Sequence, residues 1–165
     1  MFRVGDLVVY GIHGVCRIAD EEKRVVDRKR VTYLVLEPLG QQGSRYLVPT
    51  HNETAMAKLK AMLSRQELEE LLRSDQVRRD VWIADEGQRK QHYRELVSSG
   101  DREQVMEMLY TLYQHRGRQQ AAGKKIHMCD DNFLRDAEKL LSSEVSIVME
   151  LTPEDARHYI REALQ

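Results

Sequence analysis

The chain has 165 residues, and its 26 Lys and Arg against 27 Asp and Glu give a formal net charge of −1. That balance excludes a bulk polyanion binder, whose affinity depends on a large excess of positive charge. Hydrophobic residues make up 41% and charged residues 32%, a composition typical of a soluble globular protein. No run approaches the ~18 apolar residues of a membrane-spanning helix. The N-terminus lacks an apolar stretch of signal-peptide length, and two distant cysteines form no disulfide framework, so we expect a cytoplasmic protein with reduced thiols.

The first fifty residues are rich in glycine, proline and β-branched or aromatic residues, which is typical of short strands joined by turns. The pattern predicts strands over residues 7–10, 14–18, 31–36 and 46–48. It also predicts a hairpin that begins at Val25-Val26 and has a charged tip over residues 27–30. The close spacing indicates antiparallel neighbours in one strongly bent sheet or partly open barrel.

From Ser64 onward the apolar periodicity is helical, and the sequence predicts about five helices. Ser64 and Glu67 form a capping box at the start of the first helix. A second helix covers residues 85–99 and ends at Gly100, a residue type favoured just past a helix end. Asp101 opens the third helix.

The last two helices follow a polar segment with two glycines, for which we expect a loop over residues 117–125. Asp131 is expected to cap the fourth helix. Thr152 followed by Pro153 marks the start of the last one. The chain is therefore predicted to be an α+β protein in two modules, a β-module over residues 1–60 and a helical bundle over residues 61–165.

Charge is sorted along the chain. The net charge is +2 over residues 1–50, −1 over 51–85, +3 over 86–127 and −5 over 128–165. Phosphate contact needs only a local positive surface, because screening limits each contact to about 8 Å at physiological salt. The basic residues of the middle section are either candidate phosphate contacts or ordinary solvated side chains of helices.

Catalytic and metal-binding patterns are not found in the sequence. The six histidines lack the spacing of a metalloprotease helix. His127-Met128-Cys129-Asp130 brings several ligand types together, but a second cluster that would complete a tetrahedral site is missing. Gly11-Ile12-His13-Gly14 precedes no helix that would hold a phosphate, so we interpret it as a tight turn. We expect no enzymatic activity, no metal and no cofactor.

The segment Val4-Gly5-Asp6-Leu7-Val8-Val9-Tyr10-Gly11-Ile12-His13-Gly14-Val15 resembles the opening of the CarD family. The similarity continues through residues 33–36, 46–49 and 98–101. This resemblance implies a bacterial transcription regulator without catalytic activity, related in its first module to transcription-repair coupling factor. In the family, a Tudor-like barrel binds the RNA polymerase β subunit, and the helical module contacts promoter DNA at the upstream edge of the bubble and stabilises the open complex.

Carried over residue by residue, the resemblance places a polymerase-binding arginine at Arg24. The family's second basic contact falls on Leu47 in this chain, and Arg45 lies two residues earlier on the same strand face. Arg24 and Arg45 are therefore the candidate polymerase-binding residues. The alternative for Arg24 is an exposed hairpin charge.

The family also places a tryptophan wedge at the start of its DNA-facing helix, but here the aligned positions are Arg89 or Glu86. The single tryptophan, Trp82, either replaces the wedge or packs in the interior. The candidate DNA-binding residues are Trp82, Arg89, Lys90, Arg94, Arg116 and Arg118. We expect weak, sequence-independent contact with promoter DNA, and we take a monomer as the default.

A second function remains open from the sequence. In this alternative, the chain is a protein-interaction adaptor whose β-module binds polymerase or another partner, while the helical module only completes the fold. Charge reversal of Lys90 and Arg94 distinguishes the two functions, since only a DNA-contacting protein loses a salt-dependent interaction.

Overall fold

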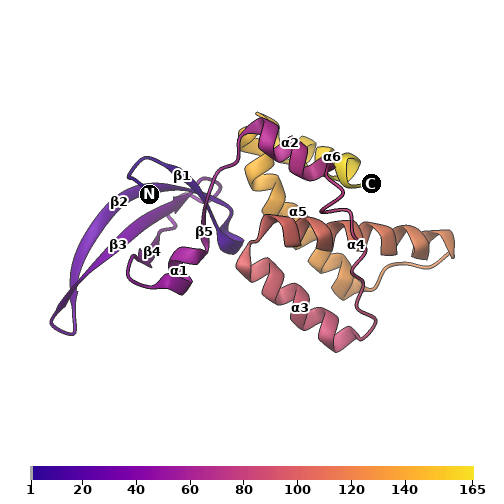
Figure 1. The fold of residues 1–165 in the computed structure, drawn as a ribbon, viewed down its shortest axis with the longest axis horizontal. Helices are drawn as coiled ribbons and strands as arrows, with labels where there is room; N and C mark the ends of the chain where they lie inside the picture. The colour runs from indigo at the N-terminus through magenta and orange to yellow at the C-terminus, as the bar shows by residue number, and fades with distance from the viewer. Residues whose placement is uncertain (1) are drawn as a thin grey trace. The chain divides into compact units, whose positions relative to one another are not determined.

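A computed structural model describes residues 2–165 of the chain. The chain forms two compact units, the first ending at Met62 and the second covering Leu63–Gln165. The first contains all the described strands and the second contains five α-helices (Figure 1). This arrangement confirms the α+β layout in two modules.

The N-terminal unit contains a five-stranded antiparallel sheet in the order β4-β3-β2-β1-β5. Its strands are β1 (Leu7–Tyr10), β2 (Val15–Val26), β3 (Lys29–Pro38), β4 (Tyr46–Pro49) and β5 (Leu59–Ala61). A 3₁₀ turn, η1 (Gly11–His13), joins β1 to β2, and a short helix, α1 (Glu53–Ala57), precedes β5. The sequence predicted four of these strands and the hairpin, but not α1 or β5, which are short and lack an alternating pattern of their own.

The core of this unit consists of side chains from one face of the sheet. Its buried members are Val8, Cys16, Ile18, Leu34, Leu36, Val48 and Leu59. The burial of Cys16 raises the pKa of its thiol to about 11, so this cysteine is an unreactive core residue.

β2 and β3 extend beyond their neighbours as a long two-stranded arm (Figure 1). In the described chain, β1 pairs with β2 only at residues 15–17 and β4 pairs with β3 only at residues 33–36. Residues 24–31, which we call the hairpin arm, are therefore paired with each other only. The arm turns at Asp27 and Arg28, which both adopt positive φ, at 50° and 66°. Two such residues between paired strands form the type I′ geometry that suits a twisted hairpin.

The second unit consists of α2 (Arg65–Arg73), α3 (Glu86–Ser99), α4 (Arg102–Ala121), α5 (Met128–Val148) and α6 (Pro153–Leu164). Side chains of Ser64, Asp85, Asp101 and Thr152 cap the N-termini of four of them by accepting a backbone N–H bond. Gly100 ends α3 in the left-handed conformation that only glycine adopts without cost. The sequence predicted the caps at Ser64, Gly100 and Thr152, and it placed the starts of α3 and α4 near Asp85 and Asp101 without assigning them as caps.

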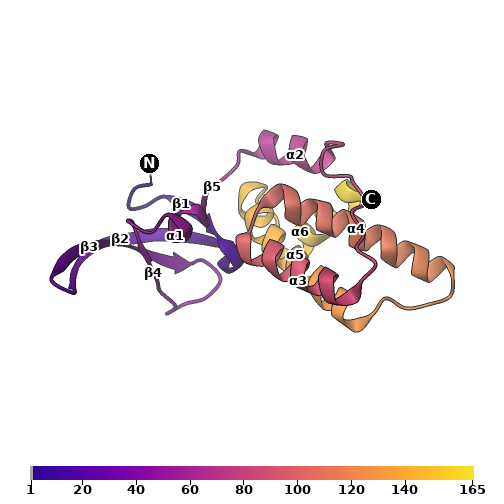
Figure 2. The same ribbon diagram turned by 60° about the horizontal axis from the view of Figure 1, so that its bottom comes forward.

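The helices enclose one apolar core. α5 packs against α3, α4 and α6 (Figure 2), and the contacts between helices also place α2 against α6. The largest buried side chains come from every helix and include Leu68, Tyr93, Met106, Leu109, Leu134 and Ile160. Burial raises the pKa of the Tyr93 hydroxyl, with Asp130 adding to the shift, so this phenol stays protonated.

Two sequence predictions for the helical unit are wrong. α4 continues through Gly117 to Ala121, because one exposed glycine costs a helix only about 1 kcal/mol and the flanking residues favour helix. α5 begins at Met128 with His127 at the N-cap, so Asp131 lies inside the first turn instead of capping it. Across residues 2–165, no helix is both long and apolar enough to cross a membrane.

Candidate functional site

The outward face of the sheet in the N-terminal unit carries the two arginines expected to bind polymerase. Arg24 is paired in register with Val31, and its guanidinium lies 5.9 Å from the centre of the Tyr33 ring. Leu47 is paired with Val35 on the same face, because directly opposed residues of neighbouring strands point the same way and alternate residues share a face. We call this surface the outer sheet face.

Arg45 also belongs to the outer sheet face. Its Nε lies 3.7 Å from a carboxylate oxygen of Glu37, which shares the face of Val31 and Tyr33. Arg24 forms its own ion pair with Glu22 at 2.8 Å. Both arginine side chains are 53% exposed, so these ion pairs are open to water and to exchange with the acidic groups of a partner.

The spacing between the arginines defines the extent of this surface. Val31, opposite Arg24, and Glu37, beside Arg45, are six residues apart on β3. At a rise of about 3.3 Å per residue, the two basic groups are on the order of 20 Å apart along the strand. The arginines therefore cannot hold a single acidic group together. They suit a partner that lies along the sheet.

The glycine-rich segment between β1 and β2 has a structural role. Tyr10, His13 and Tyr46 form an aromatic group, with the rings of His13 and Tyr46 stacked at 3.9 Å. Burial lowers the pKa of His13, and the nearby Lys58 ammonium adds to the effect. Gly14 has φ of 70°, and its carbonyl accepts the N–H of Tyr10. The segment is a tight turn, as the sequence predicted.

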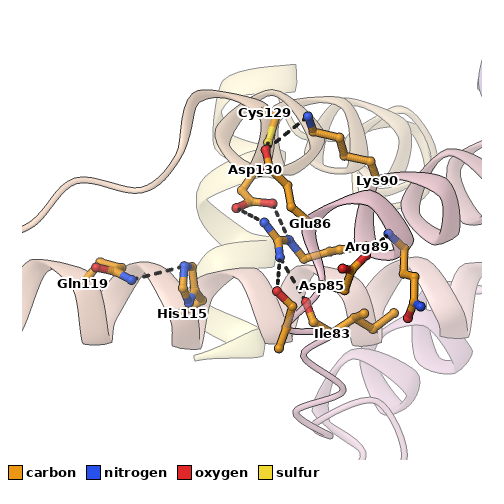
Figure 3. A network of polar contacts seen from close by, with 11 residues as sticks. Ile83, Asp85, Glu86, Arg89, Lys90, His115, Gln119, Cys129 and Asp130 are labelled. Atoms are coloured by element: carbon orange, nitrogen blue, oxygen red, sulfur yellow. Dashed lines mark hydrogen bonds and ion pairs between the residues drawn. The ribbon is translucent and has the colours of Figure 1, made fainter.

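In the helical unit, Arg89 points into the interior rather than toward solvent (Figure 3). Its guanidinium makes two hydrogen bonds to the carboxylate of Asp130, at 2.9 and 3.1 Å, and a third to the carbonyl of Ile83 at 3.0 Å. The two side chains are 6% and 1% exposed. A buried guanidinium that is paired in this way has no free edge for a phosphate. We therefore remove Arg89 from the candidate DNA contacts.

Trp82 belongs to the same assembly. Its ring stacks on the His115 ring, with 3.8 Å between the ring centres. The Arg89 guanidinium lies 4.3 Å from the centre of the Trp82 ring and forms a cation–π contact with it. The ring is half-buried and packs against the helical core. Burial lowers the pKa of His115, although the Asp130 carboxylate opposes this effect. Of the two roles left open by the sequence, these contacts support packing rather than a free wedge.

The segment that precedes α3 is fastened to α4 by polar contacts. The Thr111 hydroxyl accepts the N–H of Val81 at 3.0 Å and donates to the carbonyl of Arg79 at 3.2 Å. Arg118 pairs with Asp80 at 2.9 Å on the surface. These bonds anchor the three residues that precede Trp82.

The remaining basic candidates lie at the surface of α3 and α4. Lys90 and Arg94 are four residues apart and share one face of α3. Lys90 pairs with Glu86 at 3.1 Å, and Arg94 is exposed. Arg116 lies over the Tyr113 ring, with 5.3 Å between the guanidinium carbon and the ring centre. Arg118, which pairs with Asp80, completes the set, so the candidates are divided between α3 and α4.

The structure brings Glu86 beside His127 and Cys129, which are already close together in the sequence. Ligand atoms of Glu86, His127 and Cys129 all lie within 4.8 Å of one another. The Cys129 thiol donates to Glu86 Oε1 at 3.6 Å, and Lys90 bonds the same carboxylate. The hydrogen bond and the positive charge of Lys90 lower the pKa of Glu86. Glu86 lies at the N-terminal end of α3, and Cys129, forty-three residues later, lies at that of α5, so only the fold shows that Glu86 completes this group.

Comparison with protein families assigns the first unit. Residues 2–60 match a family described as the CarD-like/TRCF RID domain. The N-terminal unit is a CarD-like domain. The match covers the whole described sheet except the last residue of β5, and it agrees with the resemblance of the opening motif. A search of curated proteins finds no match to the chain.

Proposed function

We propose that this chain is a bacterial transcription regulator that binds the RNA polymerase β subunit through its CarD-like domain and contacts promoter DNA through its helical unit. A CarD-like domain is an RNA polymerase-interacting domain, and the family match carries this proposal. The DNA contact lies at the upstream edge of the bubble and modulates the stability of the open complex. The N-terminal sheet closes into a Tudor-like barrel in this proposal.

Two features of the CarD-like domain support a protein partner. The outer sheet face presents exposed arginines beside Tyr33 and the 39%-exposed Leu47. The hairpin arm leaves backbone edges that another strand can join by addition to the sheet. Tyrosine and arginine are among the residue types enriched at the energetically important centres of interfaces.

Binding to the isolated β subunit tests this part of the proposal. Arg24→Glu replaces a group that attracts acidic partners with one that repels them, so we expect affinity to fall at least tenfold. Arg28→Glu makes the same charge change at the exposed tip of the arm and serves as the matched control. Equal affinities of wild type and Arg24→Glu would exclude Arg24 from the interface.

The DNA contact is proposed for Lys90, Arg94, Arg116 and Arg118. The affinity for DNA grows with the number of phosphates that a protein neutralises, because each neutralised phosphate releases counterions. A nearly neutral chain with few cations therefore binds free DNA weakly. Polymerase would place the helical unit beside the duplex, where weak contacts suffice. Trp82 and Arg89 take no part, since their side chains bind each other inside the unit.

A promoter fork with polymerase present tests the DNA contact. We expect Lys90→Glu with Arg94→Glu to weaken assembly of the chain into this complex and to lower the salt dependence of binding. Glu95→Lys with Arg94 unchanged adds positive charge to the exposed side of the same helix and should act in the opposite direction. An unchanged complex and salt slope in the double charge reversal would favour the adaptor.

The adaptor is the second candidate because several of the basic residues form ion pairs within the helical unit. Arg89 is buried, and Arg118 and Lys90 each have an acidic partner. The exposed positive surface is therefore smaller than the sequence suggests. In the adaptor function, the CarD-like domain binds polymerase and the helical unit does not touch DNA.

A further inference from the structure

The N-terminal ends of α3 and α5 meet at three potential metal ligands of different chemical types. They are a carboxylate from Glu86, an imidazole from His127 and a thiol from Cys129. Sulfur, nitrogen and oxygen ligands in one group are the combination that zinc accepts, whereas magnesium and calcium require oxygen alone. We propose that these three side chains bind one zinc ion, with water as the fourth ligand.

The dimensions of the group are close to those of a zinc site. Tetrahedral geometry with Zn–S of about 2.3 Å and Zn–N or Zn–O of about 2.0 Å separates neighbouring ligand atoms by roughly 3.5 Å. The present atoms lie within 4.8 Å of one another, so binding needs a contraction of about 1 Å. Glu86 and His127 are exposed and Cys129 is partly exposed, which leaves the side chains free to make this movement.

The neighbouring acids are already engaged and do not compete for the ion. Asp130 is held by Arg89, Asp131 pairs with Arg135 at 2.9 Å, and Asp85 accepts the N–H of Gln88. The ligand set is thus limited to the three residues. Cys129 and His127 also lie at the start of α5, where the helix favours the negative charge that a metal-binding sulfur carries.

Lys90 is the internal competitor of the ion. Its ammonium lies 3.1 Å from the Glu86 oxygen that also accepts the Cys129 thiol. Zinc must displace this contact or share the carboxylate with it. Removing the ammonium should therefore strengthen zinc binding, an effect that loss of folding cannot imitate.

Zinc titration of the untagged full chain, without DNA or polymerase, tests the site independently of the proposed function. Competition with a chromophoric zinc indicator should show one ion per chain. Glu86→Gln, His127→Gln and Cys129→Ser should each weaken binding at least tenfold, and Lys90→Gln should strengthen it. His158→Gln removes an exposed histidine elsewhere and should leave the affinity unchanged.

Cobalt gives a second readout. Bound Co²⁺ should show the near-ultraviolet charge-transfer absorption of a thiolate ligand in wild type, and Cys129→Ser should lose it while keeping the wild-type circular dichroism spectrum. Absence of stoichiometric zinc binding overturns the proposal. Equal zinc affinity in wild type and Cys129→Ser also overturns it, since the ion would then bind elsewhere.

Discussion

Arginine is used differently in the two units. On the CarD-like domain, Arg24 is 53% exposed and pairs with a neighbour on its own strand, whereas in the helical unit Arg89 is 6% exposed and pairs with a carboxylate from another helix. The sequence alone does not distinguish these two arginines. The difference lies in their partners: Asp130, itself buried, stabilises the charge of Arg89 in the interior, and Glu22 binds Arg24 in water. The exposed Arg24 is therefore available to a ligand, and the buried Arg89 is not.

The largest predicted effect comes from breaking the buried pair. Asp130→Asn keeps the shape of the side chain but leaves the Arg89 charge uncompensated, so we expect the helical unit to lose about 3–5 kcal/mol of stability. Urea unfolding followed by the fluorescence of Trp82, the only tryptophan, measures this loss. Glu22→Gln, which breaks the exposed pair, is the control and should leave urea unfolding unchanged by circular dichroism. Equal losses in the two variants would contradict the contrast between the units.

The next effect concerns Trp82, which joins Arg89 to α4. Trp82→Ala removes a half-buried ring, and we expect a loss of about 2 kcal/mol, roughly half that of a fully buried tryptophan. Trp82→Phe should recover part of it by keeping the stack on His115. Chemical unfolding followed by circular dichroism measures both variants. A stable Trp82→Ala protein with a shortened open-complex lifetime would instead restore the wedge function.

These side chains show how far sequence reasoning reaches. Helix starts such as Ser64 and Thr152-Pro153 were predicted because a cap depends on residues three or four positions apart. The pairing of Arg89 with Asp130 joins positions forty-one residues apart and was not visible in local patterns. The same holds for Glu86, which only the packing of α3 on α5 brings to His127 and Cys129. Arg24 and Arg45 are exposed, as a binding role requires. Their contact with polymerase stays a prediction.

A pH effect sharpens the contrast within the helical unit. Burial lowers the pKa of His115 from its ordinary value of 6.5, so the folded state binds a proton less readily than the unfolded chain. His115 therefore costs no stability above pH 6.5, and the free energy of unfolding decreases as the pH falls through and below this value. His115→Phe keeps a ring against Trp82 and should reduce this slope. Trp82 fluorescence in urea at pH 7.5 and 5.5 measures the difference, and an identical slope in the variant would contradict it.

The smallest effect lies at the tip of the hairpin arm. Arg28 has φ of 66°, which is strained for a side chain but suits glycine in a type I′ turn. Arg28→Gly should therefore stabilise the hairpin by about 0.5–1 kcal/mol. Amide hydrogen exchange in the arm should slow in this variant. Faster exchange would show that Arg28 makes a stabilising contact of its own.

The lifetime of the open promoter complex tests the central claim most directly. Competitor challenge of preformed complexes measures it with polymerase alone, with the wild-type chain, and with the Arg24→Glu and Lys90→Glu/Arg94→Glu variants. We predict that the wild-type chain changes the lifetime and that each variant reduces this change, the first by losing polymerase and the second by losing DNA. A lifetime that is the same with and without the wild-type chain would contradict the account.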